Sequence, residues 1–463
     1  MKLGKLNRVH FVGIGGIGMS GIAEVLLTQG FAVTGSDAKE SAVVDRLRSR
    51  GARVVVGHDG ATVGDAQVLV YSSAVSPRNP EVLEARRMGI PVIPRAEILA
   101  ELMRMKSSVA VAGSHGKTTV TAMIAHIAHS AGLDPTVVIG GRLSTLDASA
   151  RLGTSDLLVA EADESDRSFL LLYPTLAVIT NIDWEHVDCY PDLADLKEAF
   201  LQFANKVPFF GACVVCSDDP SVRDILPRLT RRVVTYGTIR GAHFQALPLP
   251  ADGRGEAFRL LVSGEDRGMF RVPQVGHHIV LNSLAALAVA EELGISPEEA
   301  RSHLGTFPGA DRRFQLRGEA GGVRVVDDYG HHPTEIAATF DTARRVLANG
   351  RLVVLFQPHR YTRLAALMDN FARVLATADV VVVSDVYAAS EAPLSGISGE
   401  VLVEKIAELR GAESHFCSRV EDMPIFIAPR LERGDLVLTL GAGNITAMGP
   451  KLLDILERGG HGR

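Results

Sequence analysis

The sequence has few cysteines, and their spacing argues against both a disulfide framework and a zinc cage. There are four, at Cys189, Cys213, Cys216 and Cys417. Cys213 and Cys216 form a C-x-x-C, but they lie in the apolar run A-C-V-V-C, and no second pair completes a four-ligand zinc site. We therefore predict that both are small residues of the hydrophobic core.

The chain also lacks basic runs and long apolar stretches. It carries 48 Lys and Arg against 54 Asp and Glu, a net charge of -6, which argues against nucleic acid as a partner. No stretch approaches 18 unbroken apolar residues, and glycines interrupt the run Val9–Met19, so we expect neither a membrane span nor a secretory signal. We expect a cytoplasmic protein without a membrane partner, either a monomer or a homodimer.

With 463 residues, the chain is too long for one hydrophobic core and predicts several domains. Short apolar runs alternate with amphipathic ones from residue 8 to about 105, and this alternation predicts a parallel sheet with crossover helices. The expected strands are Val9–Val12, Phe31–Thr34, Arg53–Val56, Val68–Tyr71 and Pro91–Ile93. A linker-like turn, P-G-A-D-R-R-F at 308–314, marks a second boundary, so we divide the chain at 1–106, 107–312 and 313–463.

The first region begins with a glycine turn that predicts a diphosphate site. Residues 13–18 read G-I-G-G-I-G, which satisfies G-x-G-x-x-G, and Asp37 ends the second expected strand. The bare motif is typical of dinucleotide binding through pyrophosphate and ribose. Any diphosphate can use the same glycine turn and helix end, including that of a nucleotide sugar.

The second region opens with a phosphate-loop candidate, V-A-V-A-G-S-H-G-K-T-T-V at 109–120. Gly113 and Gly116 allow a sharp turn between a buried strand and a helix that opens at Lys117. Backbone N–H groups, the lysine charge and the Thr118 hydroxyl then suit a phosphate and Mg²⁺. Val111 replaces the glycine of the longer motif, so a plain strand-turn-helix corner is the alternative.

Two acidic segments follow later strands of the same region. D-L-L-V-A-E-A-D-E-S-D at 156–166 ends a strand in a dense carboxylate cluster, either a solvated loop or a site where Glu161 ligates Mg²⁺. The strand 176–179 leads into N-I-D-W-E-H-V-D, whose His186 is either a surface residue or a ligand. Because ligands bind at the carboxyl ends of parallel strands, we expect Gly113, Glu161 and His186 to converge.

Further polar groups are expected at the binding edge. The segment 276–293 reads as one apolar helix on which His278 and Asn282 share a side and either pack or face a ligand. In the third region, four expected strands end in polar clusters, which predicts a binding rim. Those strands are Val323–Val326, Arg351–Phe356, Val380–Val383 and Leu436–Leu440.

Eight motifs in register over nearly the whole chain resemble the Mur ligase family. They are G-I-G-G-I-G-M-S with S-D at 36–37, G-S-H-G-K-T-T, E-A-D-E-S-D-x-S-F, T-N-I-D-W-E-H-V-D, G-x-H-x-x-x-N-S-L-A-A, R-R-F-Q, D-D-Y-G-H-H-P-T-E and Q-P-H-R-Y-T-R. The resemblance implies an α/β fold of three domains: an N-terminal Rossmann-like parallel sheet for a UDP-sugar, a central P-loop ATPase, and a C-terminal Rossmann-like domain that presents an amino acid. It is strongest with the branch that joins L-alanine to the lactyl carboxylate of UDP-N-acetylmuramate through an acyl phosphate.

The resemblance also implies roles for individual residues. Catalysis would fall to Lys117, His331, Arg360 and Arg363. ATP would be held by Gly113, Ser114, His115, Gly116, Lys117, Thr118, Thr119, Asn282, Arg313 and Asp328. The UDP moiety would contact Gly15, Gly16, Gly18, Asp37, His58 and Ser72. Two Mg²⁺ ions would use Thr118, Glu161 and His186.

One departure and three alternatives accompany this interpretation. Ile279 stands where many relatives carry a second Asn on the adenine helix. A recycling ligase that joins a tripeptide to the same sugar is the nearest alternative. An NAD(P)-dependent oxidoreductase would explain the first glycine turn but not the phosphate loop, and a P-loop switch ATPase would explain the central region only.

We predict that the protein carries no carbamylated lysine. Sister ligases that add later amino acids place one about 14 residues after the metal-binding His, where Phe200 and Leu201 stand here, and Lys197 lies short of that spacing. Mass spectrometry of the native protein should find Lys197 unmodified. A mass increase of one carbon dioxide on Lys197 would contradict this prediction.

Overall fold

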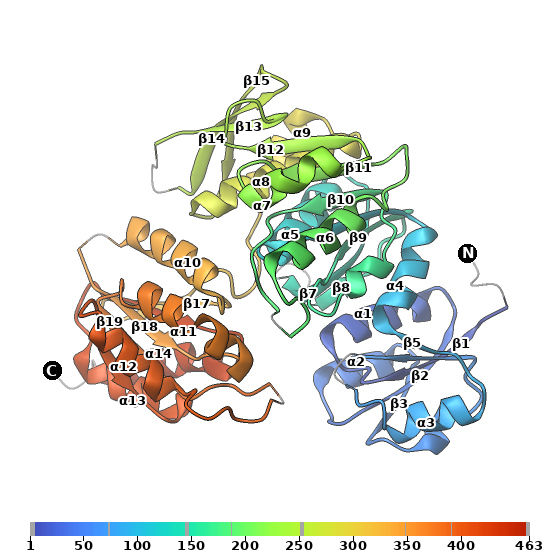
Figure 1. Ribbon diagram of the computed structural model, residues 1–463, viewed down its shortest axis with the longest axis horizontal. Coiled ribbons are helices and arrows are strands. Elements are labelled where there is room, and N and C mark those ends of the chain that lie inside the picture. The colour runs from blue at the N-terminus through green and yellow to red at the C-terminus, as the bar shows by residue number, and fades with distance from the viewer. Residues whose placement is uncertain are drawn as a thin grey trace.

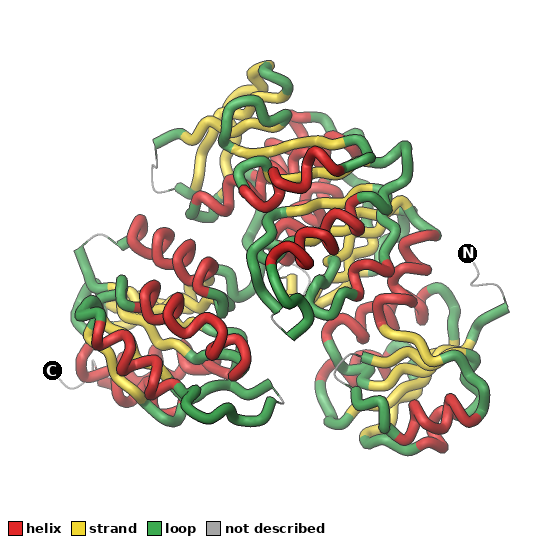
Figure 2. Tube along the Cα trace, in the orientation of Figure 1, coloured by secondary structure: helices red, strands yellow, loops and turns green. Residues whose placement is uncertain are grey.

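The computed structural model describes residues 5–72, 75–143, 148–186, 188–250, 254–347, 349–389 and 391–459. It has three sheets, each in its own domain, and this three-domain α/β fold is the one predicted (Figure 1). In the view of Figure 2, the central domain lies above, with the first and third domains on either side below it. None of the helices in these ranges combines the length and the apolar character needed to span a bilayer.

The first domain is a five-stranded parallel sheet in the order β3-β2-β1-β4-β5. The strands are β1 (Arg8–Val12), β2 (Ala32–Asp37), β3 (Arg53–Val56), β4 (Val68–Tyr71) and β5 (Val92–Pro94). The helices are α1 (Ile17–Thr28), α2 (Ala42–Ser49), α3 (Pro80–Arg87) and α4 (Arg95–Arg104), with the 3-10 turn η1 (Gly60–Val63). All five expected strands are confirmed, because short β-branched runs between helical segments have few other ways to bury both faces.

The central domain is a ten-stranded sheet in the order β15-β14-β13-β12-β11-β10-β6-β9-β7-β8. Its strands are β6 (Ser107–Ala112), β7 (Thr136–Leu143), β8 (Ala148–Arg151), β9 (Leu157–Glu161), β10 (Leu176–Ile179), β11 (Ala212–Cys216), β12 (Val233–Gly237), β13 (Phe244–Pro248), β14 (Glu256–Val262) and β15 (Glu265–Val272). Its helices are α5 (Lys117–Ser130), α6 (Leu193–Ala204), α7 (Pro220–Ile225), α8 (His277–Glu292) and α9 (Pro297–Leu304), with η2 (Ser168–Leu171) and η3 (Leu226–Arg228). Cys213 and Cys216 are buried on β11, as predicted, and burial raises the pKa of each thiol to about 12.

The C-terminal domain is a six-stranded sheet in the order β16-β17-β21-β18-β19-β20, parallel except for the β16–β17 pair. Its strands are β16 (Gln315–Ala320), β17 (Val323–Asp328), β18 (Leu352–Phe356), β19 (Val380–Val383), β20 (Glu413–Phe416) and β21 (Leu436–Leu440). Its helices are α10 (Pro333–Val346), α11 (Tyr361–Leu375), α12 (Gly399–Glu408), α13 (Met423–Ile427) and α14 (Met448–Gly459), with η4 (Val420–Asp422), η5 (Ala428–Arg430) and η6 (Asn444–Ala447). The four expected strands are confirmed.

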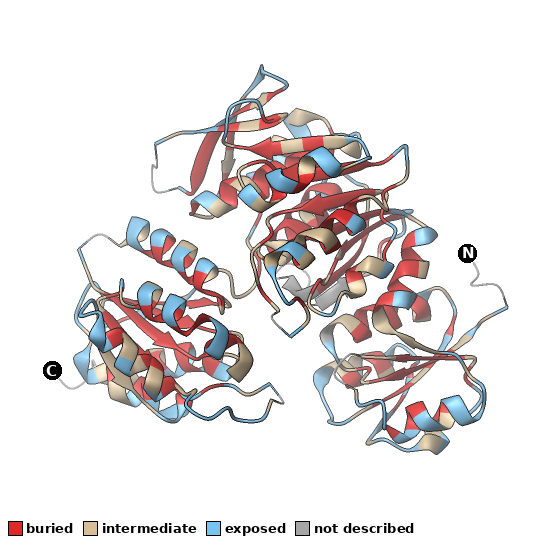
Figure 3. Cartoon of the chain, in the orientation of Figure 1, coloured by how far each residue is buried: buried red, intermediate tan, exposed pale blue. Residues whose placement is uncertain are grey.

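The sheets form the buried layer of each domain, and exposed residues gather on the outer faces of the helices (Figure 3). In the central sheet β6 lies between β9 and β10, with Val111 opposite Glu161 and Ala112 opposite Ile179. The three carboxyl ends therefore emerge side by side. This register confirms that Gly113, Glu161 and His186 converge at one edge of the sheet, Glu161 at the end of β9 and the other two in the loops after β6 and β10.

We predict that Gly113→Ala destabilises the protein more than Gly132→Ala. Both glycines have positive φ angles, +137° and +81°, so alanine at either is strained by roughly 1–2 kcal/mol. A methyl group at Gly113 would overlap the hydroxyl of Thr180, whereas at Gly132 no atom lies within 4 Å. Overpacking of this kind adds about 1–3 kcal/mol. Urea unfolding of the two variants tests this, and equal losses would contradict the proposed overlap.

Candidate active site

The phosphate loop turns between β6 and α5 and is held from the neighbouring strand end. Gly116 adopts a left-handed conformation directly before α5, and a methyl group there would lie 2.9 Å from Asn282 Oδ1. Asn181 accepts a hydrogen bond from His115 N at 2.8 Å and donates one to His115 O at 3.1 Å. The turn is therefore fixed with the amino end of α5 at the cavity edge, as anion binding requires.

Lys117 is already engaged by the loop and by a buried carboxylate. Its Nζ donates to Gly113 O at 2.5 Å, to Ser114 O at 3.0 Å and to Glu164 Oε1 at 2.8 Å. Burial alone would lower the pKa of Lys117, but the nearby Glu164 raises it above its usual value. His186 Nε2 lies 3.2 Å from the same Glu164 oxygen. Glu164 thus joins two residues of the predicted site.

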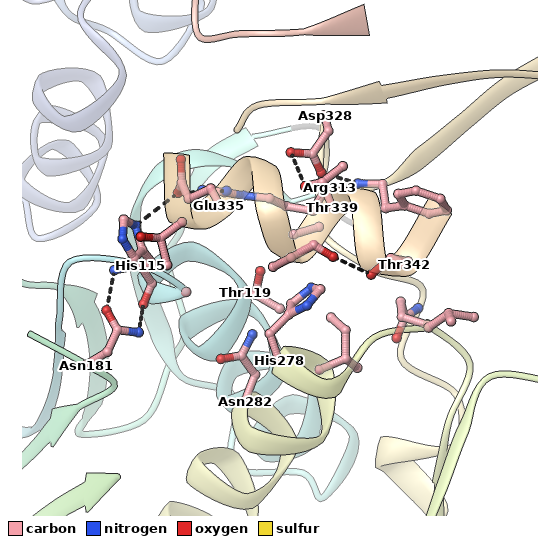
Figure 4. Close-up of a pocket in the computed structure, with 18 of the residues that line it drawn as sticks. His115, Thr119, Asn181, His278, Asn282, Arg313, Asp328, Glu335, Thr339 and Thr342 are labelled. Carbon is pink, nitrogen blue, oxygen red and sulfur yellow. Dashed lines mark hydrogen bonds and ion pairs between the residues drawn. The ribbon is translucent and has the colours of Figure 1, made fainter. Parts of the chain in front are cut away.

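A cavity of about 830 Å³ lies between the central and C-terminal domains (Figure 4). Thr119, His278 and Asn282 come from α5 and α8 on one wall, and Asp328 and Thr339 from β17 and α10 on the other. His278 and Asn282 therefore do share a side and face the cavity. Its volume suits a nucleoside-sized ligand. Burial lowers the pKa of His278 to about 4, so this side chain is neutral at pH 7.

A second cavity, of about 720 Å³, adjoins the first, because Gly116, Arg313 and Glu335 line both. It brings together all the predicted catalytic and metal-binding residues from two domains. They are Lys117, Thr118, Glu161 and His186 from the central domain and His331, Arg360 and Arg363 from the C-terminal domain. Of the remaining residues assigned to ATP, Ser114 lines this cavity, His115 lines the first, and Gly113 lines neither.

The second cavity has the donor set for a hard divalent cation. Thr118, Glu161 and His186 line it together with the carboxylates of Asp163 and Glu164. Oxygen donors of this type are the usual ligands of Mg²⁺. His186 has a positive φ of 56°, and its buried Nδ1 has no hydrogen-bond partner among the described residues. The residues present therefore fit a cation.

The loop after β10 pairs with cations of the C-terminal domain across the cavity. Arg363 donates to Glu185 at 2.7 Å, and both side chains are nearly buried. Arg360 donates to Asp188 at 2.6 Å, and His331 Nε2 lies 3.5 Å from Glu185. Burial would raise the pKa of Glu185, but His331 and Arg363 hold it well below its usual value. These pairs fix the relative position of the two domains at the site.

A second set of contacts across the same seam is centred on His115. Its Nε2 lies 3.0 Å from Asp183 Oδ2, and its Nδ1 lies 3.4 Å from Glu335 Oε1. Thr334 Oγ1 also donates to Asp183 at 2.6 Å. Burial by itself lowers the pKa of His115, but Asp183 and Glu335 raise it to about 10. His115 is therefore a cation that ties the phosphate loop to the first turn of α10.

The residues assigned to the UDP moiety lie at the carboxyl edge of the first sheet and line neither cavity. Gly15 N donates to Asp37 Oδ2 at 2.8 Å, and a methyl group at Gly15 would lie 2.9 Å from that oxygen. A methyl group at Gly18 would overlap the guanidinium of Arg95, which begins α4. Ser72 follows β4, and its N–H donates to Val12 O at 3.4 Å. Gly16 is the residue directly before α1.

Sequence reasoning missed several residues of these sites. Glu164 stands in the acidic segment, but spacing favoured Glu161 because it ends the strand. Arg95, Asp183, Glu185 and Glu335 follow expected strands or begin helices, and nothing in their local sequence separates them from surface charges. Lys197, in contrast, pairs with Asp224 at 2.7 Å and lines neither cavity.

Comparisons with known proteins agree over nearly the whole chain. Three models match it: the Mur ligase family catalytic domain over residues 8–107, the Mur ligase middle domain over 111–290, and the Mur ligase, glutamate ligase domain over 312–443. The UDP-N-acetylmuramate--L-alanine ligase of Solibacter usitatus is 53% identical over 98% of this chain and 97% of its own. That of Myxococcus xanthus is 52% identical over 97% and 95%.

Solved structures show the same arrangement. The crystal structure of UDP-N-acetylmuramate-alanine ligase from Thermotoga maritima has a TM-score of 0.81 at 28% identity and covers 98% of this chain and 99% of its own. A murein peptide ligase from Psychrobacter arcticus has a TM-score of 0.71 at 26% identity, with 97% and 98% coverage. The fold and these relatives together define the class of protein, a three-domain α/β ligase that depends on ATP. The chain belongs to the Mur ligase family.

We predict that the pH stability of the protein depends on His115. The pKa of His115 is about 10 in the folded protein and about 6.5 when unfolded, so its contribution is complete below pH 6.5 and is lost as the pH rises towards 10. Between pH 7 and 10 the unfolding temperature of the wild type should fall by about 2–4 °C more than that of His115→Gln. His129→Gln changes an exposed histidine in the last turn of α5, the helix that follows the phosphate loop, and is the control that should behave as wild type. Parallel curves for all three proteins would contradict the charge assigned to His115.

Proposed function

We propose that this protein is an ATP-dependent ligase that joins L-alanine to the lactyl carboxylate of UDP-N-acetylmuramate, with release of ADP and phosphate, in peptidoglycan precursor synthesis. One observation carries the proposal. The second cavity unites the phosphate-loop Lys117 with Arg360 and Arg363 of another domain, and it adjoins a nucleoside-sized cavity. The full-length relatives at about half identity are ligases of this specificity.

The chemistry needs activation of a carboxylate, which explains the phosphate loop. A carboxylate and an amine do not condense usefully in neutral water. Transfer of the ATP γ-phosphoryl group gives an acyl phosphate, and the free amine of alanine then attacks its carbonyl carbon and expels phosphate. Such reactions ask the protein chiefly for positioning and charge neutralisation. Lys117 supplies a buried positive charge where the phosphoryl group passes.

The C-terminal domain supplies cations for the carboxylates of the substrates. They are His331, Arg360 and Arg363, which line the second cavity and pair with Glu185 and Asp188. Guanidinium groups bind carboxylates in a planar, two-pronged geometry. We assign these three residues to the muramoyl carboxylate and the incoming alanine.

ATP is assigned to the seam between the two domains. The loop 113–119 holds the phosphates, Asn282 reads the adenine, and Arg313 and Asp328 contact the nucleotide from the C-terminal side. Asn282 lies against Gly116, so one residue touches both the nucleoside cavity and the phosphate loop. Ile279, beside it on α8, is buried and offers no polar group to the base.

We assign Mg²⁺ to the second cavity, with two ions. Thr118 would hold one, and Glu161 and His186 the other. When bound, the metal neutralises repulsion between the anionic carboxylate and the triphosphate. Glu164 is placed to support this site, because it contacts both Lys117 and His186.

The UDP moiety is assigned to the first domain. Gly15, Gly16, Gly18, Asp37, His58 and Ser72 surround the turn after β1, and the amino end of α1 suits the diphosphate. Arg95 is added here, because its guanidinium lies over Gly18 at that helix end.

We keep the domain boundaries at 106/107 and 312/313, which are supported by β6 and β16 starting new sheets at Ser107 and Gln315. The proposed reaction consumes ATP, and this requirement supports a cytoplasmic location.

The alternatives have less support. The murein peptide ligase from Psychrobacter arcticus has a lower TM-score, 0.71, than the alanine ligase from Thermotoga maritima, 0.81. An oxidoreductase would leave the buried Lys117 and the two seam cavities without a purpose.

We predict that phosphate release from ATP requires both UDP-N-acetylmuramate and L-alanine. Lys117→Ala should lower the rate by about 10²–10³-fold, because it removes one preorganised charge from the transferring phosphoryl group. Lys197→Ala, which breaks only the pair with Asp224, is the matched control and should keep wild-type activity. Substituting a tripeptide for alanine tests the nearest alternative. Phosphate release that ignores the sugar would rule out the ligase assignment.

A further inference from the structure

A fully buried carboxylate lies behind the UDP-sugar residues of the first domain. Glu81, in the first turn of α3, has a side chain with no exposed surface. Its Oε1 accepts from Ser36 Oγ at 2.7 Å and from His58 Nδ1 at 2.8 Å. Its Oε2 accepts from His10 Nε2 at 2.6 Å and from Thr62 Oγ1 at 3.1 Å. Two histidines and two hydroxyls therefore converge on one carboxylate.

The two histidines of this cluster differ in exposure and in how many of their ring nitrogens are hydrogen-bonded. His10 is buried and uses both ring nitrogens, with Nδ1 2.8 Å from Thr34 Oγ1. His58 is about one-quarter exposed, and its Nε2 has no hydrogen-bond partner among the described residues. His58 is thus held by its inner nitrogen and offers its outer one to the surface.

The same cluster is bonded directly to the glycine turn. Ser36 O accepts from Gly13 N at 2.9 Å and from Ile14 N at 3.0 Å, while the Ser36 hydroxyl donates to Glu81. Gly57 N, just before His58, donates to Asp37 O at 2.8 Å. The turn after β1 and the loop after β3 are therefore parts of one hydrogen-bonded unit that Glu81 anchors from behind.

The charge on Glu81 decides which nitrogen of the His58 ring carries a proton. Burial would raise the pKa of Glu81, but hydrogen bonds from His10, Ser36 and His58 lower it, so the group is an ionised acceptor at neutral pH. An ionised carboxylate requires a proton on His58 Nδ1. A neutral His58 then presents the lone pair of Nε2, as in carboxylate–histidine pairs elsewhere.

We propose that Glu81 is a positioning residue for the UDP-sugar, which holds His58 with Nε2 outward to accept a hydrogen bond from the uridine. The inference rests on the function proposed above. The strand order β3-β2-β1 places His58 two strands from the turn that takes the diphosphate. In sheets of this type the nucleoside extends over the ends of the second and third strands, where N–H and O–H donors of a uridine would meet it.

Binding of UDP-N-acetylmuramate to the full-length protein, measured by calorimetry without alanine, tests the proposal. Glu81→Gln should weaken binding about 10–100-fold, the loss seen when the orienting partner of a metal-binding histidine is removed. His58→Ala should weaken it to a similar extent, and the double variant should be no weaker than His58→Ala alone. ATP affinity should be unchanged in all three, because neither ATP cavity includes these residues.

The control is Thr62→Val, which removes the hydrogen bonds from the Thr62 hydroxyl to Glu81 and to Asp59 O but leaves His58 paired with Glu81. Its binding should stay within about twofold of wild type. If Glu81→Gln weakened UDP-sugar binding by the same factor in the wild type and in the His58→Ala variant, the role of Glu81 would be purely structural. That result would overturn the proposal. If the wild type bound no UDP-sugar at all, the proposed function itself would be wrong. That result differs from the one that would overturn the role of Glu81 alone.

Nitrogen NMR of the wild type provides a measurement that does not depend on how well a variant folds. The neutral His58 ring should carry its proton on Nδ1, the tautomer less common in free histidine. A proton on Nε2 instead would overturn the proposal even if every variant folded poorly.

Discussion

Charge pairing across the seam between the central and C-terminal domains is the interaction on which both cavities depend. Arg363 and Glu185 are nearly buried, so neither charge is tolerated there without the other. The charged His115 of the phosphate loop adds a second set of ion pairs at this seam, with Asp183 of its own domain and Glu335 of the C-terminal domain. These pairs therefore fix the orientation of the side chains that line both cavities.

Buried carboxylates perform the same task in each domain. Glu81 gathers four donors in the first domain, and Glu164 joins Lys117 to His186 in the second. In the third, Asp327 accepts from Arg312, Arg317 and two threonine hydroxyls. Each carboxylate has donors from several segments, so loops at the strand ends are held more firmly than backbone pairing alone would hold them.

The sequence predicted the repeated elements well and the individual contacts less well. Local sequence patterns were sufficient to predict the buried parallel strands and the helix that begins at Lys117. The edge strand β20, E-S-H-F, is polar, and β16 is interrupted by a bulge near Gly318, so neither has a strong strand signal. The contact between Glu164 and Lys117 was not predicted from the sequence. Sequence spacing reports where a strand ends, but not which side chain of the following loop turns inward.

Gly116 also has a consequence for the design of inhibitors. Because it has no side chain, Asn282 can approach it closely, and the two cavities adjoin at Gly116, Arg313 and Glu335. A single molecule that fills both chambers would pay the entropy of association once and gain contacts in two sites. A bisubstrate compound that links an adenine substitute to a carboxylate mimic is the chemical form that this geometry favours.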